Sequence, residues 1–150
     1  MLLRVKTRRE GKQVKYDHIA AACAATDMIC KSGVNENLAF RTIRAMVNVY
    51  ASEIHAGTNV PISKAAQQVI HVKGSTTLEH GTPQIPLTRM FMKAYRENTL
   101  NEEYAQRLMT KYWAIAYVTT EENKRLEALG LRSKALDTPQ ERWAKAGIEF

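Results

Sequence analysis

An acid and a histidine stand side by side in the stretch TTLEHGTPQIPLTRMFMKAY, residues 76–95. Glu79 and His80 precede Gly81 and Pro83, after which the sequence acquires the periodicity of a helix. A histidine can remove a proton from water near neutral pH, and an adjacent carboxylate can hold a divalent cation. The pair is therefore a candidate reaction centre. The alternative is a strand-end histidine that hydrogen bonds to nearby backbone.

The residues before this pair predict a β-hairpin. Two short apolar stretches flank residues 73–75, which would close a hairpin that pairs Val69 with Glu79. Such a hairpin delivers His80 to the exit of its second strand, and a helix from Leu87 follows at once.

The order of hairpin, histidine, proline loop and helix resembles the ββα-metal (HNH-type) nuclease motif. Its acid-His-x-x-Pro signature would here be Glu79-His80-Gly81-Thr82-Pro83. The resemblance implies a nuclease dependent on Mg²⁺ or Mn²⁺, in which His80 is the catalytic base and Glu79 helps to hold the metal. Asn123, which begins a later predicted helix, is a further candidate metal ligand if folding brings it near.

Positive charge is concentrated at the amino terminus. The chain carries 22 Lys and Arg against 15 Asp and Glu, a formal net charge of +7. Most of this excess falls in residues 1–15, where only Glu10 opposes the cations. Concentrated positive charge attracts polyanions through the counterions that binding releases, so nucleic acid is the first partner to consider. The alternative is a solvated edge. The cations are Arg4, Lys6, Arg8, Arg9, Lys12 and Lys15.

A second basic signal lies on the helix after the Glu-His pair. Arg89, Lys93 and Arg96 recur at i, i+4 and i+7, so they share one helix face and could grip phosphates. The alternative is the solvent side of an amphipathic helix. Residues 28–46 also have the outline of a helix-turn-helix that would present Arg41 and Arg44, although ordinary packing of a helical hairpin explains the same pattern.

Length and composition predict one compact domain. With 150 residues and 45% hydrophobic content, the chain can bury a single core. The periodicities predict a predominantly helical α+β fold with about six helices and one or two short β-hairpins. The expected organisation is a basic hairpin or arm at 1–15, a helical hairpin at 16–57, a short helix, β-hairpin and helix at 61–98, and helices with one strand at 101–150.

Several predicted helices carry recognisable start signals. Asn35 is a plausible N-cap, and either Pro61 or Ser63 can open a short helix. Thr119 and Thr138 each begin a T-x-x-E capping box, in which the threonine and the glutamate three residues later satisfy each other's backbone donors. These signals predict where the helices begin.

The remaining reactive residue types are unpatterned. The four histidines are scattered, and Cys23 and Cys30 lie too far apart along one helix for a mutual disulfide, so core packing explains both thiols. Trp143 on a short terminal helix is expected to be an exposed anchor for a partner. The chain lacks a long apolar run and a secretory signal pattern, which favours a cytoplasmic protein with no membrane association.

These observations predict a protein that binds DNA or RNA, and the ββα-metal resemblance implies a metal-dependent nuclease. An alternative is a non-catalytic binding protein, similar to compact phage-encoded inhibitors, that targets a nucleic-acid-bound complex of bacterial defence. A second alternative is a helical assembly protein, in which residues 16–31 and 35–56 pack against a second copy to form a homodimer.

Overall fold

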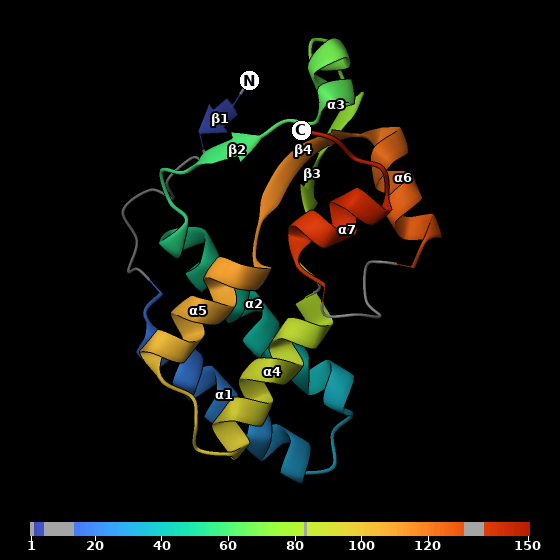
Figure 1. Cartoon of the computed structure of the whole chain (residues 1–150). Coiled ribbons are helices and arrows are strands. Elements are labelled where there is room, and N and C mark those ends of the chain that lie inside the picture. The colour runs from blue at the N-terminus through green and yellow to red at the C-terminus, as the bar shows by residue number, and fades with distance from the viewer. Residues whose placement is uncertain (1, 5–13, 83, 131–136) are drawn as a thin grey trace.

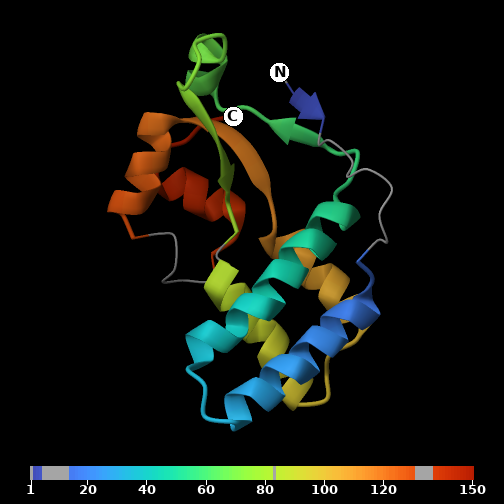
Figure 2. The same cartoon turned by 180° about the vertical axis from the view of Figure 1, so that it is seen from behind.

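Four helices pack together to form the larger of two hydrophobic clusters (Figures 1 and 2). The computed structural model describes residues 2–4, 14–82, 84–130 and 137–150. In this part of the chain there are seven helices and four short strands. The four clustered helices are α1 (Tyr16–Lys31), α2 (Glu36–Ile54), α4 (Gln84–Arg96) and α5 (Glu102–Tyr112).

The predicted helical hairpin is α1 and α2, which lie side by side (Figure 2). Ile19 and Cys23 of α1 meet Ile43 and Val47 of α2 in the interior, at the spacing of one helical face. Burial raises the pKa of the Cys23 thiol to about 12, so this sulfur behaves as an apolar group at neutral pH. The expectation that Cys23 fills the core is confirmed.

Two antiparallel strand pairs complete the fold. β1 (Leu2–Arg4) pairs with β2 (Asn59–Pro61), with Leu2 opposite Pro61. β3 (Thr76–His80) pairs with β4 (Ile115–Thr119), with Thr76 opposite Thr119 and His80 opposite Ile115. These pairs, together with the helices, confirm the predicted α+β class with mainly helical content.

A second, smaller hydrophobic cluster covers the β3–β4 pair. The short helices α6 (Thr120–Ala128) and α7 (Pro139–Lys145) lie beside these strands in both views (Figures 1 and 2). The interior residues of this cluster are Ala116, Val118, Leu126, Trp143, Ala146 and Ile148. The junction between the two clusters lies where β3 ends and α4 begins.

The helix-start predictions are confirmed. The Asn35 side chain accepts from the Asn37 N–H, and Ser63 caps α3 (Lys64–Val69) by accepting from the Ala66 N–H. Both T-x-x-E capping boxes form, at Thr119 for α6 and at Thr138 for α7. A capping hydrogen bond joins residues two or three apart, so the sequence alone can specify it.

The predicted hairpin that pairs Val69 with Glu79 is wrong. Val69 ends helix α3, and the chain then turns, with the Ser75 hydroxyl donating to the Val69 and Val72 carbonyls. Strand β3 pairs instead with β4, in which Ala116 and Val118 face the second cluster. Residues 64–69 form helix α3, which Ser63 caps, so they cannot also form a strand beside β3. β4 pairs with β3 instead, and side chains of β4 are buried in the second cluster.

This pairing also changes the topology on which the ββα-metal resemblance depends. The partner of β3 follows α4 and α5 along the chain, whereas the ββα motif needs the partner immediately before it. The other predicted hairpin, around Arg9-Glu10-Gly11, lies outside the described residues. None of the described helices is long and apolar enough to span a lipid bilayer.

Trp143 joins α7 to β3. Its indole Nε1 donates to Oε2 of Glu79 at 2.9 Å, and only 4% of the Trp143 side chain is exposed, so the predicted exposed anchor is wrong. Gly81 allows this approach, because a Cβ there would lie 2.6 Å from Cζ2 of Trp143 and 2.7 Å from Cβ of Pro139. The glycine next to the Glu-His pair is therefore required for packing.

Trp143→Phe should lower the free energy of unfolding more than Trp113→Phe. Both tryptophans are buried, but Nε1 of Trp113 makes no hydrogen bond within the described part of the chain. Removing the indole N–H from Glu79 leaves a buried acceptor without its partner, which costs about 1–3 kcal/mol. Urea unfolding of both variants measures the difference, and equal losses would contradict the structural role of this bond.

Candidate functional site

A polar cavity of about 390 Å³ lies at the junction between the two hydrophobic clusters. Its walls come from the end of β3, the start of α4, and single residues of α2, α6 and α7. In Figure 2, α6 and α7 lie beside β3, and α4 and α2 lie below its end. We call this the β3 cavity, and the residues that carry its chemistry are Arg44, Glu79, His80, Gln84, Asn123 and Arg142.

Glu79 and His80 both line the β3 cavity, but their environments differ. Successive strand side chains point to opposite faces, and Glu79 is 4% exposed whereas His80 is exposed. Glu79 is held by its hydrogen bond from Trp143. The His80 side chain makes no hydrogen bond to another described residue, so the alternative of a backbone-bonded histidine is not what the structure shows.

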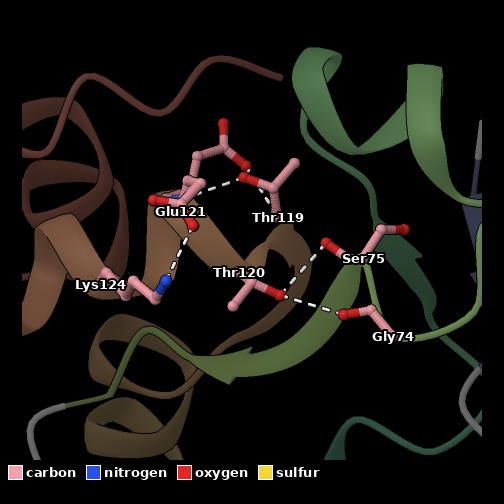
Figure 3. A network of polar contacts seen from close by, with 7 residues as sticks. Gly74, Ser75, Thr119, Thr120, Glu121 and Lys124 are labelled. Atoms are coloured by element: carbon pink, nitrogen blue, oxygen red, sulfur yellow. Dashed lines mark hydrogen bonds and ion pairs between the residues drawn. The ribbon is translucent and has the colours of Figure 1, made fainter.

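Asn123 lines the cavity from the first turns of α6, and hydrogen bonds hold the start of this helix, some of which Figure 3 shows. Glu122 of the capping box is 3% exposed, and its Oε2 accepts from the Thr119 N–H and from the Ser63 hydroxyl. Figure 3 also shows Thr120, whose hydroxyl donates to the carbonyls of Gly74 and Ser75 at 3.2 and 3.4 Å. Asn123 is the next residue after this anchored turn.

Arg142 occupies the equivalent position in α7, one residue after the capping-box glutamate. It is 1% exposed and lines the same cavity as Asn123. The Oδ1 atom of Asn123 is buried without a hydrogen-bond partner among the described residues. The cavity therefore combines a buried guanidinium, a buried carboxylate and an amide oxygen with unused accepting capacity.

A second cavity, of about 450 Å³, runs between α2 and α4. Arg41 and Arg44 line it from α2 and Arg89 from α4, and no acidic residue of the described chain does so. None of these three guanidinium groups forms an ion pair with a described acid. Arg44 and Ile85 line this cavity and also the β3 cavity, so the two adjoin. We call the cavity lined by Arg41, Arg44 and Arg89 the arginine groove.

The predicted basic row of α4 does not act as a unit. Arg89 belongs to the arginine groove, but the Arg96 guanidinium Nε lies 2.9 Å from Oδ1 of Asp27 on α1. Lys93 Nζ lies 3.9 Å from Oε1 of Glu97. A further hollow is lined by all three cations of the row and by two acids, Glu36 and Glu97. Arg89 is the one member of the row that forms no ion pair with a described acid, although the two acids of this hollow lie beside it.

The predicted amino-terminal cations are placed only in part. Arg4 lies in β1, where it is opposite Asn59. Lys6, Arg8 and Arg9 lie outside the described residues. The structure therefore does not connect this predicted patch to the arginine groove.

The chain matches no protein-family model, no curated protein and no solved structure. The ββα-metal resemblance therefore has no support beyond the residues that carry it.

The predicted metal ligands Glu79, His80 and Asn123 do line one cavity, yet they do not fit a divalent cation well. Glu79 and His80 lie on opposite faces of β3, and Oε2 of Glu79 is engaged by Trp143. Arg44 and Arg142 add positive charge to the same cavity. Within the described residues, no three His, Cys, Asp or Glu side chains are grouped to hold a metal.

The sequence patterns did not indicate Arg142 or Gln84 as site residues, and they indicated Arg44 only as part of a helix-turn-helix. Arg142 did carry a signal, since it directly follows a T-x-x-E box, as Asn123 does. A side chain at that position points back over the first turn of its helix. Nothing local reveals that two such helices and α2 face the same cavity.

Asp27 should contribute to acid resistance. Hydrogen bonds from Lys31 and Arg96 hold the pKa of this carboxyl below its ordinary value of 3.8. A lowered folded-state pKa stabilises the protein above about pH 4, and this contribution is lost as pH falls through the folded pKa. Urea unfolding from neutral to acidic pH should show a smaller decline in stability for Asp27→Asn than for the wild type. Parallel declines would contradict the assignment.

Proposed function

We propose that the protein binds nucleic acid through its phosphate backbone, along the arginine groove. The observation that supports this most strongly is that Arg41, Arg44 and Arg89 line one cavity whose lining, among the described residues, includes no acid, and that none of the three forms an ion pair there. Three adjacent guanidinium groups repel one another, and an anion placed among them removes that repulsion. Arginine also suits phosphate oxygens, because its planar donors can form paired hydrogen bonds.

Several cations elsewhere on the described surface differ from those of the groove because they are paired with acids. Lys31, Arg96, Arg107, Lys124 and Lys145 each lie within 4.0 Å of a carboxylate. An internal ion pair competes with an external phosphate, so a paired cation contributes less to binding than an unpaired one. The proposal therefore assigns the binding energy to three named residues and not to the overall net charge.

Arg41→Ala, Arg44→Ala and Arg89→Ala should each weaken binding to a short labelled oligonucleotide at fixed moderate salt. Each removes a phosphate contact, so we expect a loss of roughly threefold to tenfold, similar for different sequences. Arg96→Ala and Lys124→Ala are the matched controls, because each removes a cation that already has a carboxylate partner. Fluorescence anisotropy gives the dissociation constants.

Two results would contradict this proposal. One is that the controls weaken binding as much as the groove variants, which would mean that net charge alone is responsible. The other is that the wild-type protein binds neither DNA nor RNA at low salt.

Phosphodiester hydrolysis at His80 is a second candidate function. The specific observation in its favour is that the exposed His80 side chain lacks a hydrogen-bond partner among the described residues and shares the β3 cavity with Arg44 and Arg142. His80 could take a proton from a water that attacks phosphorus, while the guanidinium groups stabilise charge on the phosphate oxygens. The alcohol oxygen leaves and receives a proton from solvent.

His80→Ala should abolish any cleavage of labelled single- or double-stranded DNA and RNA, whereas His71→Ala should retain it. His71 is also exposed but lies in the turn after α3, away from the cavity. Reactions with Mg²⁺, with Mn²⁺ and with a chelator test the metal dependence that the sequence resemblance implies. Cleavage that persists in His80→Ala, or that is absent in the wild type under every condition, would contradict catalysis at His80.

The two other hypotheses from the sequence remain proposals with distinct outcomes. A phage-type inhibitor in the bacterial cytoplasm would bind a nucleic-acid-handling defence complex and would keep this activity in His80→Ala. An assembly protein would form a homodimer through α1 and α2, which sedimentation measures directly. Neither hypothesis predicts that Arg41, Arg44 and Arg89 act together.

A further inference from the structure

We propose that the β3 cavity holds one unpaired nucleobase of a strand bound in the arginine groove, and that it distinguishes bases by their hydrogen-bonding edges. This inference depends on the proposed nucleic-acid binding and adds the kind of ligand that the adjoining cavity takes. It assigns a role to Asn123, Gln84 and Arg142, which take no part in the proposed contacts to the phosphate backbone.

The two cavities adjoin in a way that suits one strand. Arg44 and Ile85 line both the arginine groove and the β3 cavity. A strand whose phosphates contact Arg41 and Arg89 would therefore pass the entrance of the β3 cavity. Arg44 can contact a phosphate from one side while its neighbours in the β3 cavity contact the attached base.

The polar groups of the β3 cavity match a base edge better than a phosphate. A phosphate offers acceptors only, so it would leave the buried Oδ1 of Asn123 without a donor. An exocyclic amino group of adenine, cytosine or guanine supplies that donor, and ring nitrogens and carbonyls accept from Gln84 or an arginine. The geometry of base edges pairs arginine with guanine, asparagine or glutamine with adenine, and glutamate with cytosine.

Burial makes these groups suitable for discrimination. Glu79 is 4% exposed and Arg142 is 1% exposed, so both are held in place before a ligand arrives. A base that cannot pair with a buried acceptor leaves that acceptor desolvated, which penalises the wrong ligand. The exposed His80 ring stands at the cavity and can stack on a base, as histidine does in single-strand recognition.

The size of the cavity favours a single base over a duplex. At about 390 Å³, the β3 cavity falls in the range of small-molecule sites of about 300–1,000 Å³. A stacked, paired base hides the edge that the cavity would read. The expected ligand is therefore a single strand or an unpaired end.

The test measures the affinity for thymine oligonucleotides of one length that carry a single central adenine, cytosine, guanine or thymine. Thymine lacks an exocyclic amino group, so we expect at least one amino-bearing base to bind about fivefold or more tightly than thymine. Asn123→Ala and Gln84→Ala should each reduce this preference, with circular dichroism confirming folding. Arg41→Ala should weaken binding to every oligonucleotide and preserve the ratio. Asn48→Ala, which alters a half-buried amide outside the cavity, should change neither.

The outcomes separate this inference from the proposed function. Binding without base preference in the wild type would overturn the inference and leave backbone binding intact. A preference that persists in both Asn123→Ala and Gln84→Ala would overturn the assignment to the β3 cavity. If a 5′-phosphate tightened the binding of every strand regardless of its base, the ligand of the β3 cavity would be a terminal phosphate, and the inference would be overturned. Absence of all binding would overturn the proposed function itself.

Discussion

The hydrogen bond between Trp143 and Glu79 is the contact on which the candidate site depends. A buried carboxylate at the end of a short strand is costly unless it is paired, and the indole N–H is its partner at 2.9 Å. The bond fixes α7 against β3, and Gly81 permits the close approach of the two elements. With α7 in this position, Arg142 lines the β3 cavity. The same interaction therefore stabilises the smaller hydrophobic cluster and creates the polar space beside it.

Two kinds of cation can be distinguished on this basic protein. Arg96 and Lys31 share Asp27, which ties α1 to α4 and leaves both charges compensated. Arg41, Arg44 and Arg89 lie where α2 and α4 approach each other without an acid among the groove-lining residues. Such an arrangement destabilises the free protein slightly and becomes favourable when an anion binds. The groove and the β3 cavity adjoin at Arg44 and Ile85, and our proposals assign backbone contact and base contact to separate residues.

The sequence was a good guide to local structure and a poor guide to distant partners. Caps at Asn35, Ser63 and Thr119 depend on neighbours two or three residues away, so their helices could be predicted. The partner of β3 is about forty residues away, and only packing of the complete fold selects β4 over the adjacent apolar segment. Glu79, His80 and Asn123, which the sequence offered as one metal site, line one cavity. The placement of Arg142 beside them, and of Arg41, Arg44 and Arg89 in one groove, depends on the tertiary contacts of α2, α4 and α7.

The dependence of affinity on salt tests the central claim most directly. If three groove arginines each neutralise one phosphate of a single strand, the logarithm of the association constant should fall with the logarithm of salt concentration with a slope of about −2. Removal of Arg41, Arg44 and Arg89 together should bring the slope close to zero. An affinity that does not change with salt in the wild type, or an unchanged slope in the triple variant, would contradict backbone binding in the arginine groove.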